Sequence, residues 1–77
     1  MKATLAKVIE IFRSEVDQQV PVENFDADKS FSDQGVDSLD RSSVFLALEE
    51  EFGIHFTDRD VSQLDTYNKI LDFINNK

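Results

Sequence analysis

Apolar residues at helical spacing predict a helix near the start of the chain. They recur three or four residues apart and form one stripe: Leu5, Val8, Ile9, Phe12 and Val16. Thr4 directly precedes this stripe, and threonine is a residue type that caps helix starts. Pro21 cannot lie inside a helix, so we expect this helix to end near Gln18 or Gln19.

Helical spacing returns over residues 38–52. An inward apolar stripe is formed there by Val44, Phe45, Leu48 and Phe52. Gly53 follows at once, in the position just beyond a helix end where a positive φ is favoured. The linker after Gly53 carries Ile54 and Phe56, whose side chains we expect in the core.

Two shorter helices are predicted in the last part of the chain. One covers residues 58–63 and has Thr57 as its cap. The other covers residues 66–75 and is capped by Asp65 or Thr66. The apolar stripe of this last helix consists of Tyr67, Ile70, Leu71 and Ile74.

Residues 20–37 have the composition of a loop, with proline, glycine and many short polar side chains. Phe25 and Phe31 are too apolar to stand free in water, so they should pin this loop to the core. No segment of useful length alternates as a strand does. The sequence therefore predicts an all-α four-helix bundle over residues 1–77, one domain with three longer helices, a short third helix and a long loop after the first.

Charge and cysteine content narrow the function classes. Sixteen acidic residues oppose eight basic ones, for a net charge of -8. Residues 30–65 hold nine of the acids against only Arg41 and Arg59. This field repels nucleic acid and anionic lipid, and it attracts proteins with basic patches. The chain has no cysteine, so a disulfide, a thiolate metal site and a thiol nucleophile are all excluded unless a group is added.

We expect a soluble, cytoplasmic monomer. The longest uninterrupted apolar run covers residues 44–48, which is far too short to span a bilayer. The first residues are too mixed in character for the apolar region of a signal peptide. No membrane span and no metal site are predicted.

The most informative segment is residues 35–40, which read Gly-Val-Asp-Ser-Leu-Asp. Gly35 permits a turn that other residues resist, and it brings Ser38 to the start of the predicted second helix. A phosphate on Ser38 would lie near the unpaired N–H groups and the positive end of that helix. Spacing alone leaves a plainer reading open, in which Ser38 is an ordinary helix cap.

These residues resemble the Gly-x-Asp-Ser-Leu attachment motif of the acyl carrier proteins. The likeness continues through residues 47–52, which read Ala-Leu-Glu-Glu-Glu-Phe, as at the end of that family's second helix. Residues 30–33 resemble the segment that leads into the motif, and Asp58 and residues 70–74 resemble the last two helices. The match covers nearly the whole chain in length and helix order.

The resemblance implies that Ser38 carries a 4'-phosphopantetheine arm, with Asp37 and Leu39 on either side of it. A phosphopantetheinyl transferase would transfer the arm from coenzyme A, and acyl groups would ride as thioesters on its terminal sulfur. The chain is then a carrier and not an enzyme. In agreement, His55 is the only histidine, and no Ser-His-Asp arrangement or nucleophile elbow is present.

The resemblance also implies partner and cargo sites on the second helix. Acyl-loading enzymes, ketoacyl synthases or acyltransferases with basic docking patches would recognise Asp37, Leu39, Asp40, Arg41, Ser42, Leu46, Glu49 and Glu50. An acyl chain sheltered in the bundle would contact Phe45, Leu48, Phe52, Phe56, Val61, Leu64, Ile70 and Leu71. Contacts with partners should be small, transient and sensitive to salt.

Five residues depart from the family pattern. Gln34 stands where leucine is usual, and Phe45 is bulkier than the usual aliphatic residue. At Arg41, Ser42 and Ser43 the usual residues are more often neutral or apolar, and an acid is common at the position of Ser43. We interpret them as marks of a specialised carrier in a lipid, lipopolysaccharide or polyketide pathway, with lipopolysaccharide or another lipid modification preferred over housekeeping fatty-acid synthesis. Arg41 and Ser43 would alter partner choice, and Phe45 would narrow the acyl cavity.

Three alternatives remain open from the sequence. A peptidyl carrier uses the same arm. A plain acidic interaction bundle needs no modification. A helical calcium-binding module is suggested by oxygen-bearing side chains at EF-hand spacing, although Phe31 takes the place of the required glycine: Asp26, Asp28, Ser30, Ser32, Gln34 and Asp37.

Overall fold

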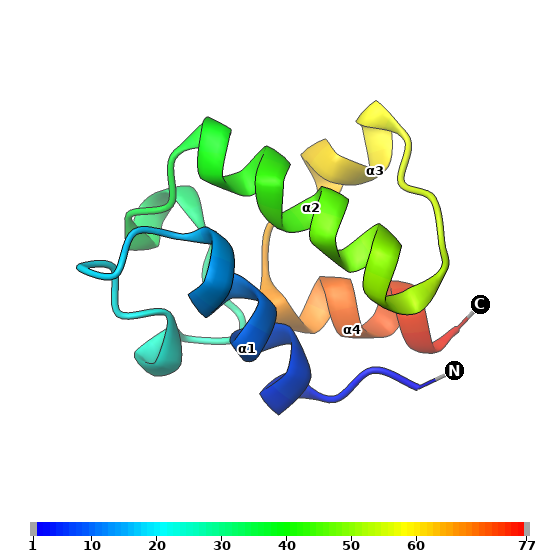
Figure 1. The fold of residues 1–77 in the computed structure, drawn as a ribbon, viewed down its shortest axis with the longest axis horizontal. Coiled ribbons are helices and arrows are strands. Elements are labelled where there is room, and N and C mark those ends of the chain that lie inside the picture. The colour runs from blue at the N-terminus through cyan, green and yellow to red at the C-terminus, as the bar shows by residue number, and fades with distance from the viewer. Residues whose placement is uncertain (1, 77) are drawn as a thin grey trace.

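The computed structural model describes residues 2–76 and is all helical over that range (Figure 1). Its α-helices are α1 (Leu5–Glu15), α2 (Ser38–Phe52), α3 (Asp58–Gln63) and α4 (Tyr67–Asn75). Two short 3₁₀ turns, η1 (Val22–Asn24) and η2 (Ser32–Gln34), lie in the long connection between α1 and α2. The described residues contain no strand, so the predicted all-α fold with three longer helices and a short third one is confirmed.

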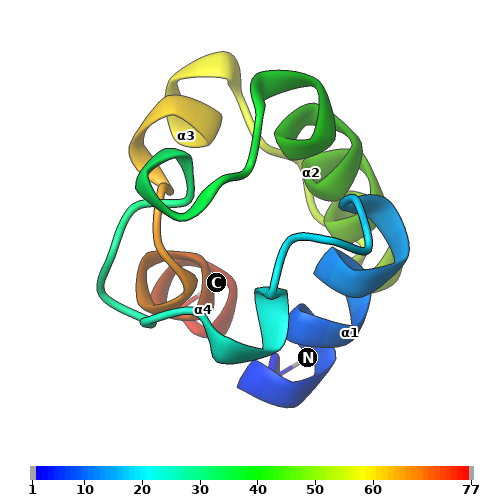
Figure 2. The same ribbon diagram turned by 90° about the vertical axis from the view of Figure 1, so that its left-hand side faces the viewer.

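The four helices surround one core, as the view along the molecule shows (Figure 2). Going round that view, α1 lies beside α2, α2 beside α3, and α4 closes the ring next to α1. The segment before α1 lies beside the end of α4 (Figure 1). There Ala3 N–H donates to Asn75 Oδ1 at 2.6 Å, and Asn75 Nδ2 donates back to the Ala3 carbonyl at 3.1 Å.

Helix α1 begins as predicted and ends early. Thr4 is its cap, with its hydroxyl accepting from the Lys7 N–H at 3.2 Å. The predicted end near residues 18–19 is wrong, because the helix stops at Glu15. Arg13 explains the stop, because its guanidinium binds the carbonyls of Val16, Asp17 and Val20. In a longer helix these carbonyls would point along the helix axis and could not converge on one side chain.

The predicted stripe of α1 is also wrong in one position. Leu5 is 39% exposed and Ile9 is half-buried, whereas Val8, Ile11 and Phe12 are buried. Ala3, just before the helix, is buried and fills the core at that end, so Leu5 is not needed there. Val8, Phe12 and Val16 are therefore buried as predicted, while Ile11 and not Leu5 completes the buried face.

The long loop is pinned by aromatic side chains, as predicted. Phe31 is fully buried, and its ring lies 4.7 Å from that of Phe12 and 5.3 Å from that of Tyr67. Phe25 is half-buried and packs 5.7 Å from the Tyr67 ring. Full burial of a side chain of this size contributes about 1.5–3 kcal/mol, so these rings hold the connection firmly against α1 and α4.

The remaining helix boundaries agree with the sequence. Gly53 ends α2 with φ of 63°, the left-handed conformation expected there. Thr57 caps α3 in a reciprocal pair with Asp60, and Thr66, rather than Asp65, caps α4. Among residues 2–76, every helix is too short or too polar to cross a bilayer.

Candidate functional site

Ser38 is the first residue of α2, at the end of the segment that leaves η2. Gly35 has φ of 101°, a conformation that glycine adopts without strain, and its N–H donates to the Ser32 carbonyl. Val36, which is buried, donates its N–H to the Phe31 carbonyl at 3.0 Å. Because Gly35 and Val36 are held by these hydrogen bonds and Val36 is buried, the chain reaches Ser38 in a defined position.

Asp37, and not Ser38, caps α2. The Asp37 carboxylate accepts from the Asp40 N–H at 2.8 Å. The plainer reading of Ser38 as the cap is therefore wrong. Ser38 is exposed, and within residues 2–76 no hydrogen bond engages its hydroxyl; its carbonyl accepts from Ser42 Oγ at 3.1 Å. The side chain is thus available for modification without loss of the cap.

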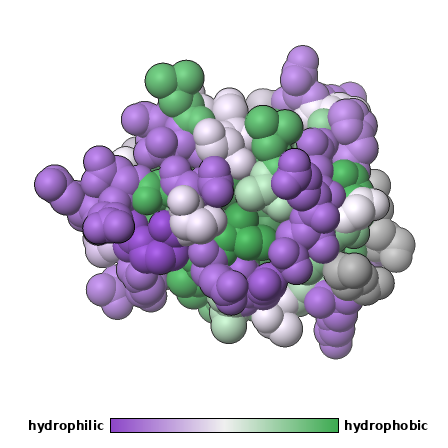
Figure 3. All heavy atoms as spheres, viewed as in Figure 1, coloured by the Kyte–Doolittle hydropathy of each residue, from purple (hydrophilic) through white to green (hydrophobic). Residues whose placement is uncertain are grey.

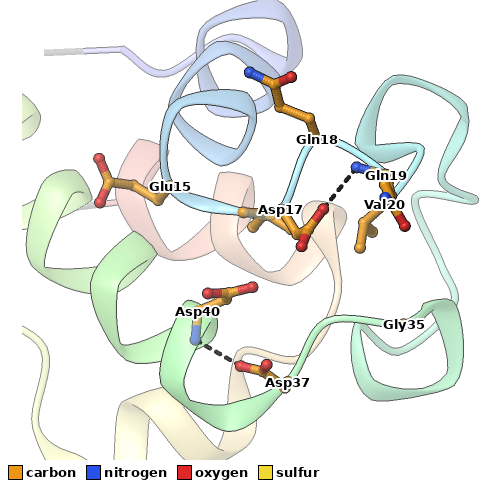
Figure 4. Close-up of a pocket in the computed structure, with 9 residues that line it drawn as sticks. Glu15, Asp17, Gln18, Gln19, Val20, Gly35, Asp37 and Asp40 are labelled. Atoms are coloured by element: carbon orange, nitrogen blue, oxygen red, sulfur yellow. Dashed lines mark hydrogen bonds between the residues drawn. The ribbon is translucent and has the colours of Figure 1, made fainter.

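An acidic hollow adjoins this helix start (Figure 4). It lies between the end of α1 and the beginning of α2, has a volume of about 850 Å³, and its acidic lining residues are Glu15, Asp17, Asp37 and Asp40. Two of these carboxylates also order the local backbone, since Asp17 accepts from the Gln19 N–H and Asp37 from the Asp40 N–H. The surroundings of Ser38 therefore carry the negative charge that the sequence concentrates here.

The exposed face of α2 carries isolated apolar side chains among polar ones (Figure 3). Leu39 is 79% exposed and Leu46 is 63% exposed, although leucine is among the residues most often buried in folded proteins. Ser42 and Glu50 are also exposed. These four residues share an open surface of the helix that starts at Ser38.

Glu49 was predicted to belong to this docking surface, but its carboxylate makes contacts within the protein. Its carboxylate accepts from the Phe56 N–H at 2.7 Å and lies 3.1 Å from His55 Nδ1. The Glu49 side chain is only 22% exposed. It ties the C-terminal part of α2 to the linker before α3, so little of its carboxylate faces a partner.

Arg41 likewise turns away from the exposed face. It is half-buried, its Nη2 donates to the Val61 carbonyl of α3, and its Cζ lies 5.9 Å from the centre of the Phe45 ring. The structure therefore places Arg41 between α2 and α3.

The predicted acyl contacts all lie in the core or against it. Phe45, Leu48, Phe52, Phe56, Leu64 and Ile70 are buried, whereas Val61 and Leu71 are half-buried. A groove of about 390 Å³ lies between α2 and α3, and Phe45, Phe56 and Val61 line it. Leu48 and Ile70 are fully buried and do not line this groove.

The residues at EF-hand spacing bind the loop's own backbone. The Asp26 carboxylate accepts from the Asp28 N–H, and Asp37 caps α2. The Gln34 amide accepts from the Asp26 N–H and donates to the Asp26 and Lys29 carbonyls. In the part of the chain that the structure describes, no group of three or more His, Cys, Asp or Glu side chains is arranged to hold a metal ion.

Two residues that position the site were missed as such from the sequence. Gln34, noted only as a departure, holds the loop closed with the three hydrogen bonds just described. Arg13, which lies outside the predicted apolar stripe of its helix, binds loop carbonyls and also the Glu23 carboxylate at 3.0 Å. A glutamine where an apolar residue is usual was the available signal for the first; nothing in the spacing indicated the second.

Comparison with known proteins defines the class. A family model described as "Phosphopantetheine attachment site" matches residues 6–74. The acyl carrier protein of Solidesulfovibrio magneticus is 37% identical over 71 residues, which cover 92% of this chain and 90% of that protein. That of Buchnera aphidicola subsp. Schizaphis graminum is 42% identical over 59 residues, 75% of each.

The chain therefore belongs to the acyl carrier protein family, and its cofactor is a covalent 4'-phosphopantetheine. The acyl carrier protein of Thermosynechococcus vestitus is 49% identical over 45 residues; that match spans 58% of this chain and 56% of that protein. The residues present fit the group, because an exposed serine with a disengaged hydroxyl stands at the N-terminus of a fifteen-residue helix.

Proposed function

We propose that Ser38 is the residue that carries the 4'-phosphopantetheine, and that the chain presents acyl thioesters on this arm to partner enzymes. The observation that supports this proposal most is that the residue that caps α2 is not the serine that would be modified. Asp37 caps the helix, which leaves the Ser38 hydroxyl exposed and disengaged. A serine used as a cap would lose that hydrogen bond on modification; Ser38 loses none.

The helix start suits a phosphodiester. The first N–H groups of α2 have no partner within the helix, and they lie at the positive end of its dipole. Asp37 uses only one of them, that of Asp40. The attached arm supplies a thiol, which this cysteine-free chain does not have. No general base is needed in the chain itself, so we propose a carrier role without catalysis.

Partner enzymes would dock on the exposed face of α2. Leu39 and Leu46 offer apolar contact area, with Ser42 between them. Asp37, Asp40 and Glu50 supply charge for a basic patch on a phosphopantetheinyl transferase or an acyl-handling enzyme. Because these acids are exposed or half-exposed, their attraction should weaken as salt is added.

A specialised pathway is supported by the use that the structure makes of the unusual residues. Gln34 closes the loop with side-chain hydrogen bonds, Arg41 binds α3, and the Phe45 ring is buried. An apolar residue at position 34 or 41 could not form these hydrogen bonds. The preference for lipopolysaccharide or another lipid modification stays a prediction, as does a cytoplasmic monomer with one domain over residues 1–77.

Intact-mass spectrometry tests the assignment. The protein is incubated with coenzyme A and a phosphopantetheinyl transferase, alongside Ser38→Ala and Ser62→Ala, which changes an exposed serine on α3. We expect wild type and Ser62→Ala to gain one phosphopantetheine per chain, and Ser38→Ala to gain none. Uptake by Ser38→Ala, or no uptake by the wild type under conditions that modify another acyl carrier protein, would refute the proposal.

A further inference from the structure

Arg41 connects α2 with α3, and few other contacts join these two helices. Its Nη2 donates to the Val61 carbonyl, and its guanidinium lies over the Phe45 ring at 5.9 Å. Arg41 Nε is buried without a partner among the described residues, so the group has been taken out of water to make this contact. An arginine placed for solubility alone would keep its charged end exposed.

Helix α3 is weakly anchored. It has six residues, none of which is buried, and Val61 is only half-buried. Its capping pair, Thr57 and Asp60, forms two reciprocal hydrogen bonds at the start of the helix. The buried residues Phe56 and Leu64 hold the two ends of α3, and the charged hydrogen bond from Arg41 to the Val61 carbonyl adds a contact within the helix itself.

The position of Arg41 relates it to Ser38 and to the α2–α3 groove. Ser38, Arg41, Phe45 and Glu49 fall at i, i+3, i+7 and i+11, on one side of α2. The groove lies farther along this side, lined in part by Phe45, Glu49 and Val61. Side chains of a helix lean toward its N-terminus, so the guanidinium stands between the groove and Ser38.

The groove has an aromatic floor. The Phe45 and Phe56 rings meet edge to face, with centres 5.0 Å apart and planes at 87°, and Phe73 packs on Phe56 at 5.3 Å. Phe45 and Phe56 are 3% and 5% exposed, so the space beneath the groove is filled. A chain entering between α2 and α3 would have to move these rings as well as Arg41.

We propose that Arg41 is a latch that holds α3 against α2 and closes the groove at the end facing Ser38, so that an acyl group on the arm stays outside the bundle. This inference rests on the proposed role of Ser38. Entry of an alkyl chain would break the charged hydrogen bond to the Val61 carbonyl and displace the packed Phe45 and Phe56 rings, and both costs oppose opening. Arg41 is then a specificity-determining residue, because it keeps the cargo exposed to partner enzymes.

The latch itself is tested on the unmodified protein by amide hydrogen exchange. Arg41→Met is compared with Arg59→Met, which removes the same charge from an exposed position on α3. We expect the amides of residues 61–63 to exchange about tenfold faster or more in Arg41→Met, as loss of a hydrogen bond to a charged donor predicts, while α1 amides and the Arg59→Met protein stay unchanged. Equal exchange in the two variants would overturn the latch.

The effect on cargo is tested on the octanoyl form, made with octanoyl-coenzyme A and a phosphopantetheinyl transferase and verified by intact mass. We expect the ring signals of Phe45 and Phe56 in nuclear magnetic resonance spectra to be the same in the unacylated and octanoyl forms of wild type and Arg59→Met. In Arg41→Met they should shift, and cleavage of its thioester by hydroxylamine should slow several-fold.

The outcomes separate the two proposals. If the wild type takes up no arm, the role of Ser38 fails, and hydrogen exchange alone still decides whether Arg41 latches α3. If the arm is attached but the rings shift as strongly in the wild type as in Arg41→Met, the latch is refuted and the role of Ser38 stands.

Discussion

The Tyr67 hydroxyl, at the start of α4, donates a 2.8 Å hydrogen bond to the carbonyl of Val22, forty-five positions earlier in the chain. Both residues are buried, and the Tyr67 ring packs edge to face on that of Phe12 at 4.9 Å. This contact fixes η1 and the loop that leads toward Ser38. The site at the start of α2 thus depends on a bond formed far from it.

Replacing Tyr67 by phenylalanine should destabilise the protein by about 1–3 kcal/mol, because the Val22 carbonyl is left buried without its donor while ring packing is kept. Urea unfolding followed by circular dichroism measures the change. Asn68→Ala is a useful control, because Asn68 follows Tyr67 in the same helix. The substitution removes an exposed hydrogen bond from the Asn68 side chain to Asp28. An effect of Tyr67→Phe no larger than that of the control would contradict the importance of this bond.

The same residue predicts a loss of stability at high pH. Burial, with a smaller effect of the Glu23 charge, raises the pKa of Tyr67 well above its usual value of 10.0. The unfolded chain therefore releases the phenol proton first, so the stability contributed by the neutral phenol is intact below pH 10.0 and declines as the pH rises beyond it. Tyr67 is the only tyrosine, so ultraviolet absorbance reports its titration directly. A phenol that titrates at its ordinary pH in the folded protein would be inconsistent with its burial.

Loss of the α2 cap is the third prediction. Asp37→Ala should cost about 1 kcal/mol of stability, as removal of a helix cap generally does, whereas Asp37→Asn should cost less because it can still accept the Asp40 N–H. Asp33→Ala changes the same charge at an exposed position of η2 and should have little effect. If Asp33→Ala and Asp37→Ala are equally stable, the cap does not contribute as described.

Ser43 offers a test of partner choice. It is exposed on α2 and stands where an acid is common in related carriers. Ser43→Glu should raise kcat/KM several-fold with a ketoacyl synthase that has a basic docking patch, and added salt should remove the gain. Arg41 was also predicted to alter partner choice, but its side chain faces α3, so a substitution there would loosen that helix as well. Unchanged rates with Ser43→Glu would exclude a role for this position.

The sequence predicted the helices well where caps and stop signals are local. Gly53 marks the end of α2, and Thr57 and Thr66 mark the starts of α3 and α4, because each acts on residues within one turn. The end of α1 was missed because Arg13 reaches several residues ahead to bind carbonyls that the helix would otherwise use. Long side chains form such contacts only after the loop has folded back.

The candidate site shows the same division. Exposure of Ser38, Leu39 and Leu46 follows from their place on α2 relative to the apolar stripe, and could be expected from spacing. The contacts that Arg41 and Glu49 make with the α3 region could not be predicted, because the sequence alone indicates an exposed charge at either position. Which charged residue serves as a docking group is decided by the neighbouring element.

The central claim is the position of the arm, and a peptide map of the modified wild-type protein tests it most directly. Trypsin cleaves after Lys29 and Arg41, which isolates residues 30–41 and their three serines, Ser30, Ser32 and Ser38, from Ser42 and Ser43. Fragmentation of this peptide should place the phosphopantetheine on Ser38. Its presence on Ser30, on Ser32 or in the following peptide would contradict the account.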